Sequence, residues 1–422
     1  MIKRIVLYSL LFTSLLSVSA YAGTDDETAY ALNTLLFLVS GFLVMLMAAG
    51  FCMLESGMVT SKSVSTIAAK NIGLYSIAGL MFWVIGYNVA YGIPEGGYIG
   101  SFTPWSDASA IDTGYSDGSD WFFQMVFCAT TVSIVSGTLA ERIKIWPFFL
   151  FAAILTGIIY PIEMGWQWGG GWLSAAGFSD FAGSTLVHAA GGAAALAGAI
   201  VLGPRLGRFS NGKLVPFASS SIPLATLGTF ILWFGWFGFN GGSQLALAGF
   251  ENATAVATIY INTNLAACAG VMTCAVITRL INGKTDVIMM LNGALGGLVA
   301  ITAEPLTPTP LMAIIIGSIG GIIVILGTQA LNKFQIDDVV GAIPVHLFAG
   351  IWGTLAVPLT NSGTSFGPQL LGTASICAFV FVVSFIVWSI MKATIGIRIS
   401  EEAEKEGTDI AETGVTAYAI RD

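Results

Sequence analysis

The sequence predicts an all-α integral membrane protein, with eleven transmembrane helices arranged as an inverted 5+5 repeat plus a final helix. Apolar residues make up 55% of the 422 residues and charged residues only 9%, whereas a soluble domain carries about 25% charged residues. Apolar stretches long enough to cross a bilayer recur along the whole chain. The chain has only two histidines, His188 and His346, and both lie inside such stretches.

Eleven segments are expected to span the membrane, because each is apolar over roughly the 20 residues that a bilayer requires. Their ranges are 31–56, 64–92, 120–140, 145–163, 182–203, 219–240, 254–279, 286–303, 310–331, 338–358 and 369–392. They form a predicted membrane domain of residues 23–395, followed by a tail of residues 396–422.

Residues 1–22 are predicted to be a cleaved secretory signal. Lys3 and Arg4 precede a short apolar stretch, and the small-residue site Ala20-Tyr21-Ala22 ends it. The alternative is a first membrane anchor that stays attached to the protein.

Basic residues predict the orientation. Of the 16 lysines and arginines, all except the two in the signal fall at alternate loops or in the tail. The opposite loops, near 93–119, 164–181, 241–253, 304–309 and 359–368, have none. The positive-inside rule therefore places the amino terminus outside and the carboxyl terminus in the cytoplasm. We expect a multi-pass protein of the cell inner (plasma) membrane.

The two histidines share one local frame, D-x-x-G-x-x-x-V-H, at residues 180–188 and 338–346. Five spans per half is an odd number, so the second half must be inverted relative to the first. Each histidine lies eight residues after its aspartate, about 12 Å along a helix axis. Both imidazoles are therefore expected near the middle of the membrane, where inverted-repeat transporters place their sites.

An ionisable side chain in hydrocarbon is costly and marks a functional site by default. The alternatives are two unrelated buried histidines bonded to local hydroxyls or carbonyls, or a pair that ligates a haem iron. Asp180 and Asp338 are expected to cap helix starts, with attraction of a cation as a second role for Asp180. No nucleotide loop, paired acids or nucleophile motif indicates an enzyme, and nothing indicates a cofactor, a metal or nucleic acid.

Aromatic residues gather near the predicted outer span ends. An interfacial belt explains most of them, and a cation–π site at a pore entrance is the alternative. These residues are Trp121, Phe122, Phe123, Phe127, Trp166, Trp168, Trp172, Trp233, Phe234, Trp236, Phe237 and Phe239. Glu55, Glu163 and Glu304 lie at predicted span ends and are expected to be solvated or capping groups.

Several stretches together resemble the ammonium transporter (Amt) family, which is related to the Rh proteins. The resemblance runs from about residue 31 to residue 418. The stretches are Gly137-Thr-Leu-Ala-Glu-Arg142, Trp168-Gly-Gly-Gly171, residues 180–188, Gly235-Trp-Phe-Gly-Phe-Asn240, residues 337–346 and 407–414. The resemblance implies a homotrimer in membrane lipid with a pore in each protomer. It implies ammonium or ammonia as substrate, with methylammonium as an analogue, and a PII-type signalling protein as a partner at the cytoplasmic face.

The resemblance also implies roles for individual residues. His188 and His346 match the family's paired pore histidines, and Phe127 and Phe239 match its stacked outer gate. The implied ammonium recruitment site consists of Phe127, Trp168 and Ser243. Further matches are pore-lining or structural, and these are Trp236, Asp180, Phe123 and Gln124. The chain departs from the family at Thr413, where many members have histidine, and in residues 163–168, which lack a histidine that members often carry.

Overall fold

The computed structural model describes residues 24–418. Within this range, nine long apolar helices and two shorter ones cross the molecule. They coincide with the eleven predicted spans and confirm the all-helical membrane fold. The predicted signal, residues 1–22, lies outside the described residues.

The first half contains five spans. They are α2 (Asp26–Met58); α3 (Val64–Met81), continued by a π-helical turn (Phe82–Gly86) into α4 (Tyr87–Tyr91); α5 (Asp117–Thr138); α6 (Ile145–Ile154), continued by a π-helical turn (Leu155–Ile159) into α7 (Tyr160–Gly165); and a π-helical turn (Ser184–Ala189) that leads into α9 (Ala190–Leu202). A 3-10 turn (Ile111–Thr113) and the short helix α8 (Trp172–Ala175) lie in its loops.

The second half repeats this order and adds a final helix. Its elements are α10 (Ile222–Gly242); α11 (Phe250–Asn282); α12 (Val287–Thr302); α13 (Pro310–Lys333); a π-helical turn (Ile343–Phe348) that leads into α14 (Ala349–Ala356) and a 3-10 turn (Val357–Leu359); and α15 (Phe366–Thr394). A small hairpin, β1 (Phe209–Ser210) and β2 (Lys213–Leu214), lies between the halves. The tail forms α16 (Glu401–Glu406) and a π-helical turn (Asp409–Thr413).

Several helices begin where the sequence supplies a cap. The side chains of Ser221, Asp286 and Thr309 accept hydrogen bonds from backbone N–H groups three residues later. Such caps satisfy amides that have no partner inside the helix. Prolines follow two of these caps, in the first turn of α10 and at the first residue of α13, where a missing N–H costs nothing.

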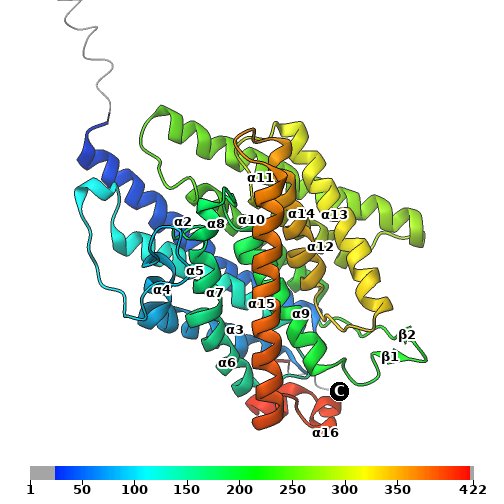
Figure 1. Ribbon diagram of the computed structural model, residues 1–422. Helices are drawn as coiled ribbons and strands as arrows, with labels where there is room; N and C mark the ends of the chain where they lie inside the picture. Colours follow the sequence, from blue (N-terminus) through cyan, green and yellow to red (C-terminus); the bar gives the residue numbers. More distant parts are fainter. Residues whose placement is uncertain (1–23, 419–422) are drawn as a thin grey trace, which may run out of the picture.

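The first helices of the two halves, α2 and α10, pack along each other, and α9 lies against α15 (Figure 1). Glycines permit the close approach of α2 and α10. A Cβ at Gly57 would lie 2.3 Å from the backbone nitrogen of Ala225, and a Cβ at Gly228 would lie 2.2 Å from that of Leu54. Small residues at such crossings let helix backbones touch in lipid.

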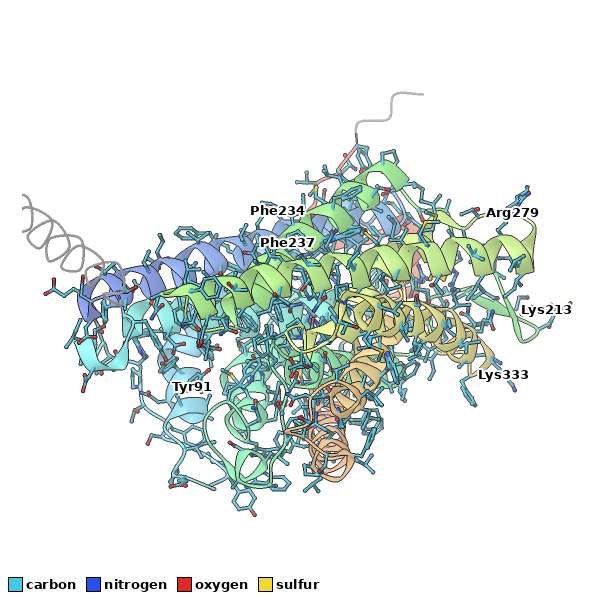
Figure 2. All side chains as sticks on the ribbon, turned by 90° about the horizontal axis from the view of Figure 1, so that it is seen from above. Tyr91, Lys213, Phe234, Phe237, Arg279 and Lys333 are labelled. Atoms are coloured by element: carbon cyan, nitrogen blue, oxygen red, sulfur yellow. The ribbon has the colours of Figure 1, made fainter. Side chains whose placement is uncertain are left out.

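The outer surface of the bundle is apolar. Large side chains such as Phe42, Leu80, Phe230 and Leu326 are exposed on it, which suits contact with lipid rather than water. Phe234 and Phe237 project from α10 (Figure 2). Lys213, Arg279 and Lys333 lie together at one end of the molecule (Figure 2).

The tail packs against that same end, called the tail face below. The carboxylate of Glu404 accepts a hydrogen bond from Leu206 N at 2.7 Å, and that of Asp409 accepts one from Thr66 N at 2.8 Å. Glu412 accepts one from Ile145 N at 2.7 Å. The tail therefore binds the loop after α9 and the first turns of α3 and α6 through buried or half-buried carboxylates.

A charge cluster stabilises the tail face beneath the tail. Asp337 forms ion pairs with Arg205 at 2.8 Å and Arg208 at 3.3 Å, and Arg142 donates to its backbone oxygen at 2.7 Å. Burial alone would raise the pKa of Asp337. The hydrogen bonds from Arg205 and the charges of Arg142 and Arg205 outweigh burial and lower it.

Candidate functional site

Each copy of the repeated frame builds the same local structure, a capped turn that carries one histidine. Asp180 accepts hydrogen bonds from the backbone N–H groups of Gly183, Ser184, Thr185 and Leu186, at 2.7 to 3.0 Å. Gly183 has φ +105°, a conformation that residues with a Cβ rarely adopt. Asp180 therefore caps the start of this helix, which is the role predicted from the sequence.

The second frame repeats this turn. Asp338 accepts from the backbone N–H groups of Gly341 at 3.1 Å and Ile343 at 2.7 Å, and from the hydroxyl of Thr138 at 3.0 Å. Gly341 has φ +79°. Both turns continue into π-helical segments, Ser184–Ala189 and Ile343–Phe348, that carry the histidines.

The two imidazoles meet. Nδ1 of His346 lies 3.2 Å from Nδ1 of His188, and the ring centroids are 5.2 Å apart with an interplanar angle of 24°. His188 is 0% exposed and His346 is 2% exposed. At this distance one Nδ1 carries a proton and the other accepts it in a hydrogen bond. The prediction that inverted halves bring both rings together is confirmed.

The contact excludes two alternatives. The histidines are partners of each other rather than of unrelated local hydroxyls. A haem iron held from both sides would keep the two nitrogens about 4 Å apart, with the porphyrin between the rings, and the direct contact of 3.2 Å does not fit that arrangement.

A stack of aromatic rings lies on the side of His188 away from His346. The rings of Phe127 and Phe239 are stacked, with centroids 4.0 Å apart and an interplanar angle of 24°. The imidazole of His188 stacks on Phe239 at 5.2 Å and on Trp236 at 4.8 Å. Trp236 is fixed by a hydrogen bond from its Nε1 to the hydroxyl of Thr302 at 2.8 Å. The phenylalanine pair therefore closes the lane directly above the first histidine.

A cavity of about 270 Å³ opens beyond this stack, on the face opposite the tail. It contains every residue of the recruitment site that the resemblance implied, together with Phe123 and Gln124. Its lining residues are Tyr87, Tyr91, Tyr115, Asp120, Phe123, Gln124, Phe127, Trp168, Phe181, Ser243 and Leu245. We call this cavity the vestibule.

Two vestibule residues, Trp168 and Ser243, are oriented by their neighbours. The Trp168 ring packs edge-on against Phe127 at 5.9 Å, and its Nε1 donates to Asp180 O at 2.9 Å. The Ser243 hydroxyl donates to Phe239 O at 2.9 Å. Because its proton is used there, the oxygen lone pairs of Ser243 are left to accept a hydrogen bond from a ligand.

Asp120 is a vestibule residue that the sequence analysis missed. Its carboxylate accepts hydrogen bonds from the Tyr87 hydroxyl at 2.6 Å and from Gln124 Nε2 at 3.1 Å. Helical spacing was the available signal. Asp120, Gln124 and Phe127 are four and seven residues apart and thus share one face of α5.

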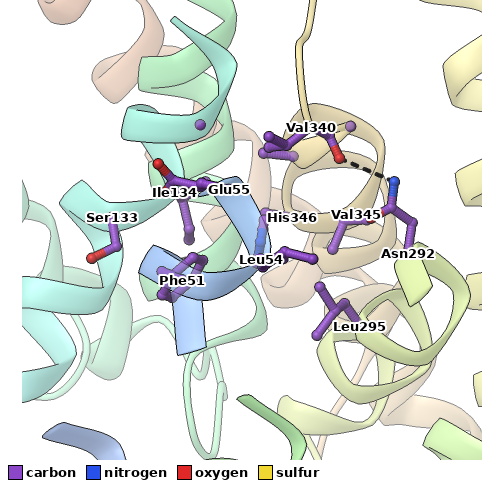
Figure 3. A pocket seen from close by; sticks show the side chains of 13 residues that line it. Phe51, Leu54, Glu55, Ser133, Ile134, Asn292, Leu295, Val340, Val345 and His346 are labelled. Atoms are coloured by element: carbon purple, nitrogen blue, oxygen red, sulfur yellow. Dashed lines mark hydrogen bonds between the residues drawn. The ribbon is translucent and has the colours of Figure 1, made fainter. Parts of the chain in front are cut away.

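On the tail side of the histidines lies a much smaller cavity of about 10 Å³, which we call the inner cavity. His346 lines it together with Phe51 and Glu55 of α2, residues of α5, and Asn292 and Leu295 of α12 (Figure 3). Asn292, Val340 and Gly341 also line a cavity of about 540 Å³ at the tail face. The vestibule, ring stack, histidine pair and inner cavity thus follow one another across the molecule.

The expectation for two of the three glutamates was wrong. Glu55 is 1% exposed and Glu163 is 0% exposed, because helices from distant parts of the chain cover both span ends. Glu304 does cap a turn, since it accepts hydrogen bonds from Leu306 N, Thr307 N and Asn361 Nδ2.

Comparison with known proteins shows similarity to ammonium transporters along most of the chain. A model of the Ammonium Transporter Family matches residues 35–418. The chain is 41% identical over 418 residues to the ammonium transporter Amt2 of Archaeoglobus fulgidus, covering 90% of this chain and 87% of the relative. It is 34% identical over 409 residues to an ammonium transporter of Bacillus subtilis, covering 92% and 98%.

Solved structures also match. One titled "Sensor Amt Protein" superposes with a TM-score of 0.87 at 33% identity, covering 92% of this chain and 100% of that one. The crystal structure of Candida albicans Mep2 superposes with a TM-score of 0.82 at 26% identity, covering 94% and 95%.

Proposed function

The chain belongs to the ammonium transporter family, and from that premise we propose that it takes ammonium from the vestibule and passes ammonia through the histidine-lined lane. The family is one of transporters, not of enzymes. The observation that carries the proposal is the Nδ1–Nδ1 contact of 3.2 Å between two buried imidazoles on a line between two cavities.

Ammonium is recruited in the vestibule. The faces of Phe127 and Trp168 attract a cation through their ring quadrupoles, and Ser243 accepts an N–H hydrogen bond through its free lone pairs. The carboxylate of Asp120, 7% exposed, adds negative charge to the same cavity.

The stacked pair Phe127 and Phe239 makes the next step selective. Beyond it the lane is apolar and buried, so a full ion that enters loses its hydration at a cost of several kcal/mol. Ammonium avoids this cost by giving its proton to water in the vestibule, which becomes hydronium, and crossing as ammonia. Potassium carries no proton to release, and the same barrier excludes it.

The histidine pair then receives ammonia. The rings offer hydrogen-bonding groups in an otherwise apolar stretch, and their mutual contact fixes the ring orientations. Trp236 and Phe239 hold His188 from one side, and Phe51 lies 6.2 Å from the ring of His346.

Methylammonium uptake into a transport-deficient host tests the proposal. Cells that express the wild-type chain are expected to accumulate methylammonium, and His188→Ala or His346→Ala is expected to abolish uptake or to admit potassium. Thr394→Ala, which changes an exposed hydroxyl on α15, serves as the expression control. Normal, ammonium-selective uptake in both histidine variants would remove the proposed role. Binding without uptake by the wild type would instead favour an ammonium receptor.

We further propose that the tail face is cytoplasmic and that the vestibule faces outward, with residues 1–22 cleaved as a signal and residues 396–422 forming the cytoplasmic tail. The basic residues at the tail face support this orientation. Protease digestion of inside-out inner-membrane vesicles is expected to remove the tail, whereas intact spheroplasts protect it. The reverse pattern contradicts the orientation.

We propose a homotrimer as the assembly and a PII-type protein as a partner of the tail face. The exposed apolar side of the bundle suits subunit contact in lipid. The mass of the purified protein in detergent, measured by light scattering, tests the trimer. Co-purification of the partner tests the second proposal, and no interaction under nitrogen-rich conditions counts against it.

A further inference from the structure

Glu55 is a buried carboxylate that the lane described above does not use. It lies near the end of α2, is 1% exposed, and lines the inner cavity that His346 also lines (Figure 3). A carboxylate in such a position is costly unless it has partners. Its contacts therefore decide what it does.

The two oxygens of Glu55 differ. Oε2 accepts hydrogen bonds from the Ser136 hydroxyl at 2.8 Å and from Asn71 Nδ2 at 3.2 Å. Oε1 is buried and has no hydrogen-bond partner among residues 24–418. Nearly all buried polar atoms in proteins are hydrogen-bonded. A carboxylate held by one oxygen, with the other left over, is a ready acceptor for a small N–H donor.

Lys70 is a second buried charged residue near Glu55, and the two form no direct hydrogen bond, because each contacts a different atom of Ser136. Lys70 is fully buried, donates from Nζ to Ser136 O at 2.7 Å, and lies over the Phe148 ring at 5.0 Å. Ser136 thus contacts both Lys70, through its backbone oxygen, and Glu55, through its hydroxyl. Lys70 balances charge in this region, but its amine is already directed at Ser136.

The inner cavity suits one small molecule. Its volume of about 10 Å³ approaches the space that one water needs, and ammonium is of similar size. Gly137 helps to leave this space, because a Cβ there would lie 2.5 Å from Cγ2 of Val340 and 3.2 Å from Cγ of Glu55.

We propose that Glu55 forms a second ammonium subsite on the tail side of the histidine pair, an inference that rests on the proposed transport function. Ammonia that passes His346 gains a proton from hydronium of the adjoining 540 Å³ cavity, which becomes water. The ammonium formed donates an N–H to Oε1 of Glu55. This charge-assisted hydrogen bond sets the affinity of the lane for ammonium that arrives from the tail face.

Ammonium uptake by membrane vesicles of both orientations tests the subsite, since either face of the full chain can then be exposed to the substrate. Glu55→Gln keeps the shape and removes the charge. It is expected to raise the half-saturating ammonium concentration about tenfold at the tail face, and to leave the value at the vestibule face within about twofold. A purely structural role lowers ammonium uptake equally from both faces.

Two further variants complete the test. Glu163→Gln neutralises another fully buried glutamate, which lines neither the vestibule nor the inner cavity, and is expected to leave both half-saturating values unchanged. If Glu55 only balances Lys70, the double variant Glu55→Gln/Lys70→Met restores the wild-type value at the tail face. If Glu55 binds ammonium, the double variant keeps the raised value.

The outcomes separate the subsite from the transport function. A wild-type chain that takes up no ammonium from either face overturns the proposed function. A wild-type chain that transports, with equal half-saturating values at the tail face for wild type and Glu55→Gln, overturns the subsite alone.

Discussion

The two histidine-bearing turns share a backbone but not an environment. Both begin with an aspartate, pass through a glycine of positive φ and enter a π-helical turn. Asp180 binds four backbone N–H groups, whereas Asp338 binds two and a hydroxyl. The residue that matches Leu186 in the second turn is Pro344, which has no N–H to donate. The duplicated frame thus determines where each histidine lies. Single differences in sequence, such as Pro344 in place of Leu186, determine how many hydrogen bonds stabilise each turn.

The residues before the two aspartates differ more. Ser179 exchanges two hydrogen bonds with the amide of Gln369, at 2.7 and 2.8 Å. Its counterpart Asp337 lies among arginines of the tail face. The first turn is anchored to the final helix by neutral hydrogen bonds, and the second is anchored to the tail face by ion pairs. The stability of the second turn is therefore expected to depend more strongly on pH.

The largest expected difference is between Asp180→Ala and Asp338→Ala. The first leaves four backbone N–H groups without their acceptor, and a buried unpaired donor costs about 1–3 kcal/mol. We expect the free energy of unfolding to fall by at least about 4 kcal/mol for Asp180→Ala and by roughly half as much for Asp338→Ala. Thermal unfolding of the purified proteins in detergent measures this. Equal losses would show that the two turns are energetically equivalent.

Asp337→Asn is expected to have the next largest effect. It should lower the free energy of unfolding by about 3 kcal/mol, because it leaves the buried guanidinium of Arg205 poorly paired. The folded-state pKa of Asp337 lies below its ordinary value of 3.8. Its stabilisation is therefore fully present above pH 3.8 and is lost as the pH falls below that value. The gap in melting temperature between wild type and variant should stay constant from pH 6 to about pH 4 and shrink at lower pH. A gap that is independent of pH would contradict the ion-pair account.

Replacement of the two turn glycines comes third. A Cβ at Gly183 would lie 2.6 Å from Cγ2 of Val187, a branched side chain within the turn itself. A Cβ at Gly341 would meet Nδ2 of Asn292 at 2.5 Å, the movable end of a longer side chain. Both alanines adopt an unfavourable φ, which costs about 1–2 kcal/mol. We expect Gly183→Ala to be the more destabilising, and the same unfolding assay decides.

Pro344→Ala is expected to change least. It adds a backbone N–H at the position from which Leu186 N donates to Asp180. The new hydrogen bond stabilises the folded protein, whereas the greater freedom of the unfolded chain destabilises it. Each effect on the free energy of unfolding is about 1 kcal/mol or less. Unfolding and uptake should both stay near wild type. A marked loss of uptake would show that the proline itself positions His346.

Much of the fold follows from the sequence, because its signals are local. Hydropathy over about 20 residues locates the spans, and the alternation of basic loops confirms their number. The repeated frame around His188 and His346 predicts their meeting, since an odd number of spans per half inverts one copy. The family motifs add the vestibule residues Trp168 and Ser243, which no periodicity singles out.

Tertiary structure decided the parts that depend on distant neighbours. Glu55 lies at a span end, where the sequence predicts a solvated group. In the structure its carboxylate is buried and accepts hydrogen bonds from Asn71 and Ser136, which lie 16 and 81 residues further along the chain. Asp120 became part of the vestibule only because Tyr87 and Trp168 close around it. Hydropathy and repeats specify which segments enter the membrane and in which direction. Whether a given polar atom faces a cavity, a partner or lipid is set by packing between segments far apart in the chain.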